Sequence, residues 1–234
     1  MWALSNRMLL DLWESGRRGS PIDRALLLLA AADPKHDRAA LAEISIPRRD
    51  AAVLALRCRA LGRTLPGVVD CPRCSERLEF EFDGETLLAS ATSATPEPIR
   101  IGALRFRLPN TGDLIATSAI ADPQRATRQL LQSCCLDASG DKEWPDELLA
   151  QAESGLSAHA GAANTRFHFD CEVCGHAWDA LFDICAYFWE ELEARAQVLL
   201  DDVHRLALAY GWDEQRILAL SDVRRDAYLA RCDP

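Results

Sequence analysis

The spacing of apolar and polar positions divides the chain into helical segments at both ends and a mixed region between them. Over residues 3–61, apolar positions recur at intervals of three and four, as in amphipathic helices. Ser20-Pro21 is a typical helix start, because serine can cap a helix and proline suits its first turn. The pattern predicts helices over residues 3–15, 20–33, 38–43 and 48–61.

Two later segments alternate with the period of two that is typical of strands. Each carries a Cys-x-x-Cys sequence, at residues 67–82 and again at residues 166–178. We predict that each forms a strand, a Cys-x-x-Cys turn and a second strand, with Ser75 and Gly175 suited to the turns. The apolar positions of these strands are Leu78, Phe80 and Phe82 in the first segment, and Phe167, Phe169, Trp178, Ala180 and Phe182 in the second.

The stretch between the two cysteine segments reads as an organised insertion. Residues 85–98 show no clear period and are predicted to form a loop. Residues 99–108 alternate around a glycine, which predicts a β-hairpin or a bent strand. Three helices are expected to follow, over residues 110–120, from 122 to about 134, and over 147–159, before a linker at residues 161–164.

The longest periodic segment covers residues 184–210 and predicts one long helix that ends at Gly211. Two short helices are expected after it, the last over residues 224–232. The apolar stripe of the long helix is formed by Cys185, Trp189, Leu192, Ala196, Leu199, Val203, Leu206 and Tyr210. Acidic residues mark the other side, which we expect to be solvated: Glu190, Glu191, Glu193, Asp201 and Asp202.

Together these elements predict an α+β, mostly helical protein built around a split four-cysteine zinc ribbon with two β-hairpin knuckles. We expect an N-terminal helical region at residues 1–66 and the split ribbon at 67–183, with its strand pair and helices inserted at 85–164. A C-terminal helical region follows at residues 184–234. The three parts are expected to form one compact unit.

The four cysteines Cys71, Cys74, Cys171 and Cys174 are the predicted metal ligands. Two Cys-x-x-Cys turns place four sulfurs around one ion, the arrangement of a structural zinc site. The alternative is two redox or unrelated pairs, but a thioredoxin-like pair opens a helix, whereas strands are predicted after both pairs here. His176 follows the second pair and could compete as a ligand, although a surface or packing role fits it better.

Composition narrows the classes of function. The 234 residues carry a formal net charge of −10, which argues against a nucleic-acid partner because phosphate binding relies on lysine and arginine. The longest apolar run, residues 25–32, is too short to span a membrane, and the first residues lack a signal-peptide pattern. We expect a cytoplasmic protein, whose other cysteines are buried free thiols: Cys58, Cys134, Cys135, Cys185 and Cys232.

Motifs that carry catalysis are not found in the sequence. It has no phosphate-binding glycine loop, no His-Glu-x-x-His, no Gly-x-Ser-x-Gly and no dinucleotide fingerprint. A zinc ion held by four thiolates is closed and structural, because a catalytic zinc keeps a position open for water. We therefore expect a protein that is not an enzyme.

Several short motifs follow one another in a distinctive order along the chain. They are Arg48-Arg49-Asp50, Leu54-Ala55-Leu56-Arg57, Leu61-Gly62, the two cysteine pairs, Leu104-Arg105-Phe106-Arg107-Leu108-Pro109, Asp113-Leu114, and Ala209-Tyr210-Gly211-Trp212-Asp213-Glu214 with Ile217-Leu218 and Arg224-Arg225. This order resembles the baseplate hub assembly chaperone family of T-even-type contractile phages, as found in bacterial phage-tail-like contractile injection systems.

That resemblance implies a non-enzymatic protein that assembles a contractile-tail baseplate or is incorporated into the tail-like particle. Its partners would be baseplate or hub proteins, with no nucleic acid and no membrane, and its oligomeric state is left open. A different reading is a zinc-ribbon nucleic-acid-binding or transcription accessory protein. Such ribbons usually present a basic face, whereas this chain is acidic and its arginines are dispersed.

Overall fold

The computed structural model describes residues 4–91, 98–137, 144–161 and 165–232, which form a mixed α+β protein that is mostly helical, as predicted. The helices are α1 (Asn6–Gly16), α2 (Pro21–Ala32), α3 (Arg38–Ala42), α4 (Ile46–Leu61), α5 (Gly84–Ala91), α6 (Thr111–Thr117), α7 (Pro123–Cys134), α8 (Asp146–Ala158), α9 (Ile184–Tyr210), α10 (Glu214–Leu218) and α11 (Asp222–Leu229). The strands are β1 (Thr64–Asp70), β2 (Arg77–Asp83), β3 (Ile99–Ile101), β4 (Leu104–Phe106), β5 (Arg166–Asp170) and β6 (Ala177–Leu181).

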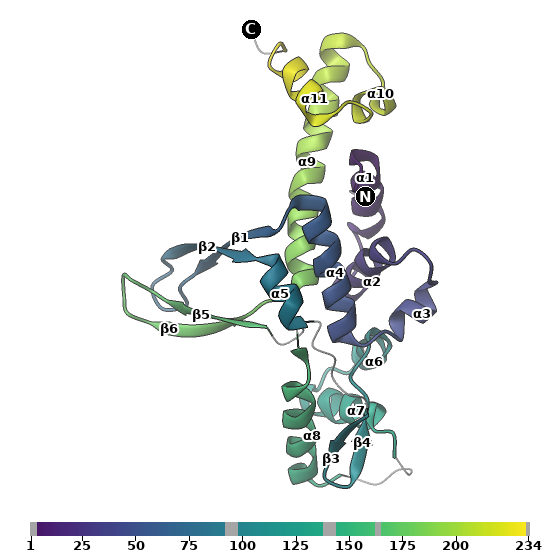
Figure 1. Ribbon diagram of the computed structural model, residues 1–234, viewed down its shortest axis with the longest axis vertical. Helices are drawn as coiled ribbons and strands as arrows, with labels where there is room; N and C mark the ends of the chain where they lie inside the picture. The colour runs from purple at the N-terminus through teal and green to yellow at the C-terminus, as the bar shows by residue number, and fades with distance from the viewer. Residues whose placement is uncertain (1–3, 92–97, 138–143, 162–164, 233–234) are drawn as a thin grey trace.

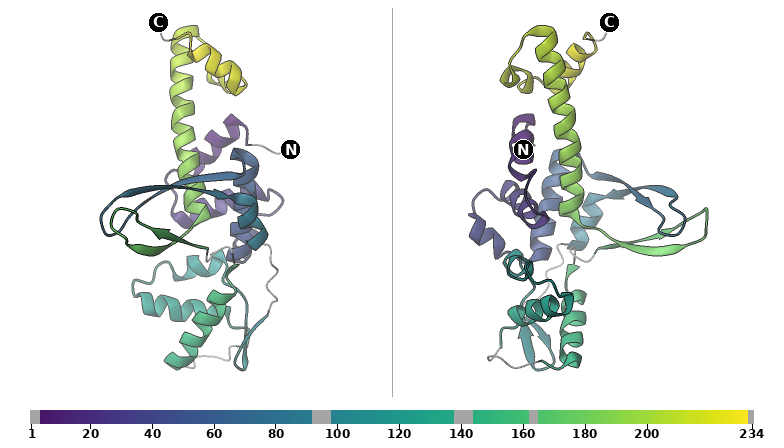
Figure 2. Two further views of the ribbon diagram at one scale, coloured as in Figure 1. Left: turned by 60° about the vertical axis from the view of Figure 1, so that its left-hand side comes forward. Right: turned by 180° about the vertical axis from the view of Figure 1, so that it is seen from behind.

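The long helix α9 forms the axis of an elongated molecule (Figure 1). Helices α1, α2 and α4 pack against its N-terminal half, and α10 and α11 fold back against its C-terminal end. The two cysteine hairpins, β1–β2 and β5–β6, project together from one side of α9 (Figure 2). Between these hairpins in sequence, residues 98–137 and 144–161 form a separate lobe, the inserted lobe, beyond the N-terminal end of α9.

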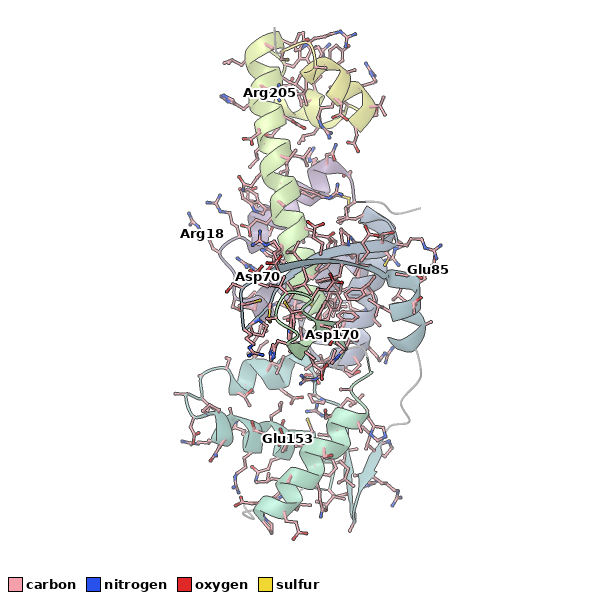
Figure 3. The ribbon with its side chains drawn as sticks, turned by 90° about the vertical axis from the view of Figure 1, so that its left-hand side faces the viewer. Arg18, Asp70, Glu85, Glu153, Asp170 and Arg205 are labelled. Carbon is pink, nitrogen blue, oxygen red and sulfur yellow. The ribbon has the colours of Figure 1, made fainter. Side chains whose placement is uncertain are left out.

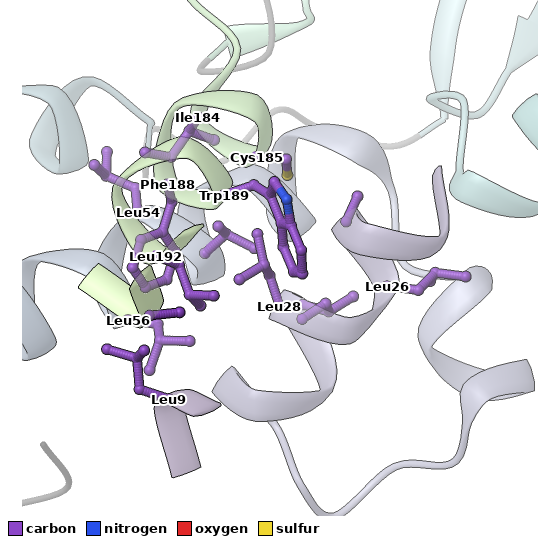
Figure 4. Packing of buried hydrophobic residues seen from close by; sticks show 14 of the residues in the cluster. Leu9, Leu26, Leu28, Leu54, Leu56, Ile184, Cys185, Phe188, Trp189 and Leu192 are labelled. Atoms are coloured by element: carbon purple, nitrogen blue, oxygen red, sulfur yellow. The ribbon is translucent and has the colours of Figure 1, made fainter. Parts of the chain in front are cut away.

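The first hydrophobic core lies where α9 meets α1, α2 and α4. Leu28, Leu56, Phe188 and Leu192 are among its buried members and meet between the helices (Figure 4). The apolar stripe predicted for residues 184–210 is confirmed over most of its length, since Cys185, Trp189, Leu192, Ala196, Leu199 and Leu206 are buried. Gly16 lets α1 approach closely, because a Cβ there would lie 2.4 Å from the Trp189 ring.

A second hydrophobic core holds the inserted lobe together. The predicted hairpin at residues 99–108 is confirmed, with Ile99 of β3 paired to Phe106 of β4. Phe106 is fully buried, and Trp144 meets it edge-on at a ring distance of 5.8 Å. Cys134 of α7 and Leu156 of α8 complete this core. The insertion therefore has an interior of its own and does not depend on the first core for burial.

The prediction of a loop over residues 85–98 is wrong for its first half, because α5 occupies Gly84–Ala91. Residues 92–97 lie outside the described part of the chain. Leu87 and Leu88 pack against the first core, and α5 lies along α4. A helix this short shows too few periods to be read from its sequence, so its packing against α4 decides its structure.

Two members of the acidic side of α9 are not solvated as expected. Glu191 forms a salt bridge with the buried Arg57, at 2.5 Å from Nη2 and 2.8 Å from Nε. Asp202 is buried and accepts a hydrogen bond at 2.9 Å from Nε of Arg225. These acids therefore fix α4 and α11 to α9.

Among the described residues, no helix is both long enough and apolar enough to cross a membrane.

The inserted lobe joins the helical body through a short set of polar contacts. The N–H of Ile46 donates to the carbonyl of Pro109 at 2.8 Å. Next to it, the buried Arg49 contacts Thr111 at 3.3 Å and forms an ion pair with Asp50 at 2.7 Å. Because these groups are removed from water, the junction is positioned by their hydrogen bonds as well as by apolar packing.

An aromatic cluster closes the C-terminal end of α9. Gly211 ends this helix in the left-handed conformation, as predicted, with φ of 64°. The Trp212 ring lies 4.7 Å from Tyr210 and 4.8 Å from Tyr228, measured between ring centres. Ile217 of α10 is fully buried. The short helices after Gly211 therefore pack back onto α9.

Replacement of Arg57 tests the buried salt bridge between α4 and α9. Arg57 also donates to the carbonyls of Gly62 and Thr64, at 2.8 and 2.7 Å. Arg57→Met should lower the free energy of unfolding by about 3 kcal/mol, because it leaves Glu191 without its cationic partner and removes the donor to both carbonyls. Urea unfolding followed by circular dichroism measures this change. Arg63→Met, which removes an exposed ion pair, is the control, and equal losses in the two variants would contradict the assignment.

Candidate metal centre

The first cysteine turn is built by strands β1 and β2. Their antiparallel register pairs Asp70 with Arg77, immediately outside the turn that holds Cys71 and Cys74. The turn closes through hydrogen bonds of 2.8 Å, from the N–H of Ser75 to the carbonyl of Cys71 and from the N–H of Cys71 to Glu76. Ser75 has a φ of 62°, the left-handed conformation that folds the chain back on itself.

The second turn repeats this geometry on strands β5 and β6. The N–H of Gly175 donates to the carbonyl of Cys171 at 2.8 Å, and the N–H of Cys171 donates to His176 at 2.9 Å. Gly175 has a φ of 67°, matching Ser75 in the first turn. The two half-sites predicted from the sequence are therefore the same local structure formed twice, by strands that flank the insertion.

The four cysteine sulfurs come together at the outer ends of the two hairpins. The Sγ atoms of Cys71 and Cys174 are 3.7 Å apart, and those of Cys74 and Cys171 are 3.6 Å apart. All four sulfurs lie within 4.8 Å of one another and could hold a metal ion. A tetrahedral ion with metal–sulfur distances of about 2.3 Å requires sulfurs separated by about 3.8 Å. The closest pairs already have this spacing.

The crowded thiols of the cluster differ in how readily they ionise. Burial raises the pKa of Cys71, but hydrogen bonds from the backbone N–H groups of Arg73 and Cys74 outweigh it and bring that pKa to about 7. The N–H of Glu76 lowers the pKa of Cys74, yet its neighbouring thiols, Cys174 first, and burial raise the net value to about 12. One thiol thus ionises readily while its neighbour resists. A metal cation supplies the positive charge that allows crowded thiols to ionise together.

Aromatic packing holds the two hairpins face to face. Phe82 of β2 stacks on Phe167 of β5 with ring centres 3.4 Å apart, and Phe80 lies 5.1 Å from Phe169. These are the inward positions that the alternating pattern predicts. Gly67 of β1 makes room for the Phe80 ring, because a Cβ there would lie 2.2 Å from it. The aromatic layer thus brings the sulfurs together although, among the described residues, the two hairpins form separate two-stranded sheets.

Figure 3 views the hairpins from their outer ends and labels Asp70 and Asp170, which precede the first cysteine of each pair. The two cysteine hairpins together form an arm, and its base is attached to α9, where the hydroxyl of Tyr187 donates to the carbonyl of Pro66 at 2.6 Å. This contact was not anticipated from the sequence. Gly67, which follows Pro66 in β1, makes room for Phe80 of the same hairpin and gives no sign of this contact with α9.

Neither histidine near the centre belongs to the cluster. His176 stacks against Trp178, with ring centres 5.9 Å apart, which agrees with the packing role favoured for it. His168 points away from the aromatic layer and contacts Asp179 at 2.8 Å. Hydrogen bonding to Asp179, together with the charge of Asp170, raises the pKa of His168. Among the described residues, the four cysteines alone form a cluster with metal-ligand spacing.

The other cysteines are free thiols outside the centre: Cys58, Cys134, Cys135, Cys185 and Cys232. Cys134, Cys135 and Cys185 are buried as predicted, whereas Cys58 and Cys232 are half-buried. Burial raises the pKa of Cys134 to about 11. Cys134 is an unsuitable metal ligand, because it lies in the second hydrophobic core, away from the cluster, and its thiol ionises only at high pH.

The geometry defines a protein that carries a closed four-thiol centre between two hairpins. No family model, no curated protein and no solved structure matches the chain. The resemblance seen in the sequence therefore remains a prediction, and the centre is interpreted from its own residues.

Exchange of the turn residues tests the equivalence of the two half-sites. Gly175→Ser should lower the free energy of unfolding by about 1 kcal/mol, because it places a side chain in the left-handed region. Ser75→Gly should not lower it, since glycine adopts that conformation without strain. Thermal unfolding of both variants with metal in excess gives the comparison. A similar destabilisation in both would show that the two turns are not equivalent.

Proposed function

We propose that Cys71, Cys74, Cys171 and Cys174 hold one structural zinc ion in a non-enzymatic protein that assembles, or becomes part of, the baseplate of a contractile phage tail-like injection system. The observation that carries the metal part is the four-sulfur cluster, with closest spacings of 3.6 and 3.7 Å. Its formation by two equivalent turns argues against a chance meeting of free thiols.

Zinc is the ion that this donor set suits best. Four thiolates are soft ligands in a tetrahedral arrangement, which is typical of zinc and of iron–sulfur sites, and paired Cys-x-x-Cys turns on hairpins are typical of zinc ribbons. With all four positions taken by cysteine, the ion has no place for a water molecule or a substrate. A structural role follows, and zinc would supply cross-linking of the two hairpins rather than chemistry.

The cross-link would act on more than the hairpins. Cys71 and Cys174 are 103 residues apart in sequence, so zinc bound by both closes a loop that contains the whole inserted lobe. Because such a site is absent from the unfolded chain, metal binding adds to the free energy of folding. The two hydrophobic cores lie outside the cluster and would keep part of the helical structure when the metal is removed.

The baseplate part of the proposal rests on the order of sequence motifs. Its support in the structure is indirect: an elongated body with two projecting hairpins suits a protein that bridges others. The outer faces of the hairpins also favour protein over nucleic acid, because acidic residues such as Glu79, Glu81 and Asp179 outnumber the basic ones there.

Metal analysis of purified protein tests the zinc site. We expect one zinc ion per chain in protein prepared without chelator, measured by elemental analysis together with protein concentration. Cys71→Ser/Cys171→Ser should lose the ion, because one ligand is removed from each turn. Cys232→Ser is the matched control and should keep it, since Cys232 lies outside the cluster. Zinc-free wild-type protein, or a double variant with unchanged zinc, would refute the site.

Co-purification tests the baseplate role. The tagged protein, expressed with the neighbouring tail genes, should retain baseplate or hub proteins, and its presence in purified particles would identify it as a component rather than a transient factor. The same expression without the baseplate genes is the control. If no tail protein is enriched while the protein retains DNA on filters at both low and high salt, the nucleic-acid alternative replaces this proposal.

A further inference from the structure

Helix α9 presents a second stripe on the side opposite its buried one. Ala194, Val198, Asp201, Arg205 and Leu208 follow one another at intervals of four and three, so they share one face of the helix. Val198 is 59% exposed and Leu208 is 81% exposed. Leu208 is the most exposed large hydrophobic residue in the part of the chain that the structure describes.

The short helices at the chain end leave this face open. Helix α11 is attached to another side of α9 through Asp202 and Arg225, and Leu206 is buried on that same side. In Figure 3, Arg205 is labelled on the C-terminal part of α9, and the hairpins emerge further down the helix. The face is therefore both apolar in part and accessible.

The last four members of the stripe are symmetric about position 203. Val198 and Leu208 lie five residues to either side of it, and Asp201 and Arg205 lie two residues to either side. When two copies of one helix pack antiparallel about a two-fold axis at this level, each residue faces the one equally far beyond the axis. Val198 then meets Leu208 of the partner subunit, and Asp201 meets Arg205 of the partner subunit.

We propose that two copies of this chain associate through an antiparallel pair of α9 helices centred at position 203. Every contact occurs twice, with two apolar pairs on the outside and two ion pairs of opposite charge on the inside. Arg205 already interacts within its own chain. A guanidinium group carries five N–H donors, so it can bind the carboxylate of Asp201 from the other copy as well.

The occupant is a second copy because the charges complement themselves. A parallel pair in register would place Asp201 against Asp201 and Arg205 against Arg205, and like charges across a helix seam oppose association. The antiparallel pair replaces both repulsions with attractions. The contact involves few apolar side chains and two ion pairs, so we expect reversible association that weakens as the salt concentration rises.

Sedimentation velocity over a concentration series on the full chain tests the proposal. The mass should rise from the 25.9 kDa of one chain toward twice that value at high concentration. Asp201→Arg and Arg205→Asp should each weaken association at least tenfold, because each creates like-charge contacts across the axis. The double variant D201R/R205D should restore it, since the charges are exchanged but remain complementary.

Two apolar substitutions complete the design. Leu208→Glu should keep the protein monomeric, whereas Val223→Glu should leave association unchanged, because Val223 is 79% exposed but lies on α11 outside the stripe. Circular dichroism shows whether each variant is folded. A wild-type chain that stays monomeric throughout would overturn the proposal, as would a folded double variant that remains monomeric or a Leu208→Glu variant that dimerises normally.

Discussion

The meeting of the two cysteine hairpins is the contact on which the arrangement of the chain depends. The paired sulfurs come from residues 97 and 103 positions apart, and the inserted lobe lies between them in sequence. The Phe82–Phe167 stack brings the hairpins together, and the four thiols close their outer ends. Aromatic packing acts without a metal, whereas the thiols gain from one, so the two contributions reinforce each other.

Buried ion pairs position the helices around that arm. Arg57 ties α4 to α9 through Glu191, and Arg225 ties α11 to α9 through Asp202. Arg57 and Arg225 belong to the motifs on which the resemblance to a baseplate assembly family rests. Because both arginines are buried, these positions of the motifs contribute to packing between helices and are not available to a partner. A partner surface has to be sought among exposed residues, such as the open face of α9.

Local structure was largely predictable from the sequence. The period of three and four located the long helix at Ile184–Tyr210, and the period of two located the strands beside both cysteine pairs. The metal-ligand candidates could be named because Cys-x-x-Cys within alternating strands has a restricted geometry. Prediction failed at α5, where a single short helix is stabilised by its neighbours rather than by its own pattern.

The sequence by itself determined which residues form the helices other than α5, the hairpins and each half of the candidate metal centre, because these depend on spacing over a few residues. That the halves meet was predicted, but only the tertiary structure shows how they do so, through the Phe82–Phe167 stack and with the Sγ atoms of Cys71 and Cys174 3.7 Å apart. It also decided that Glu191 and Asp202 are ion-pair partners rather than part of a solvated face. The sequence pattern does not distinguish an acidic residue that faces water from one that pairs with a buried arginine, because the arginine can lie far along the chain.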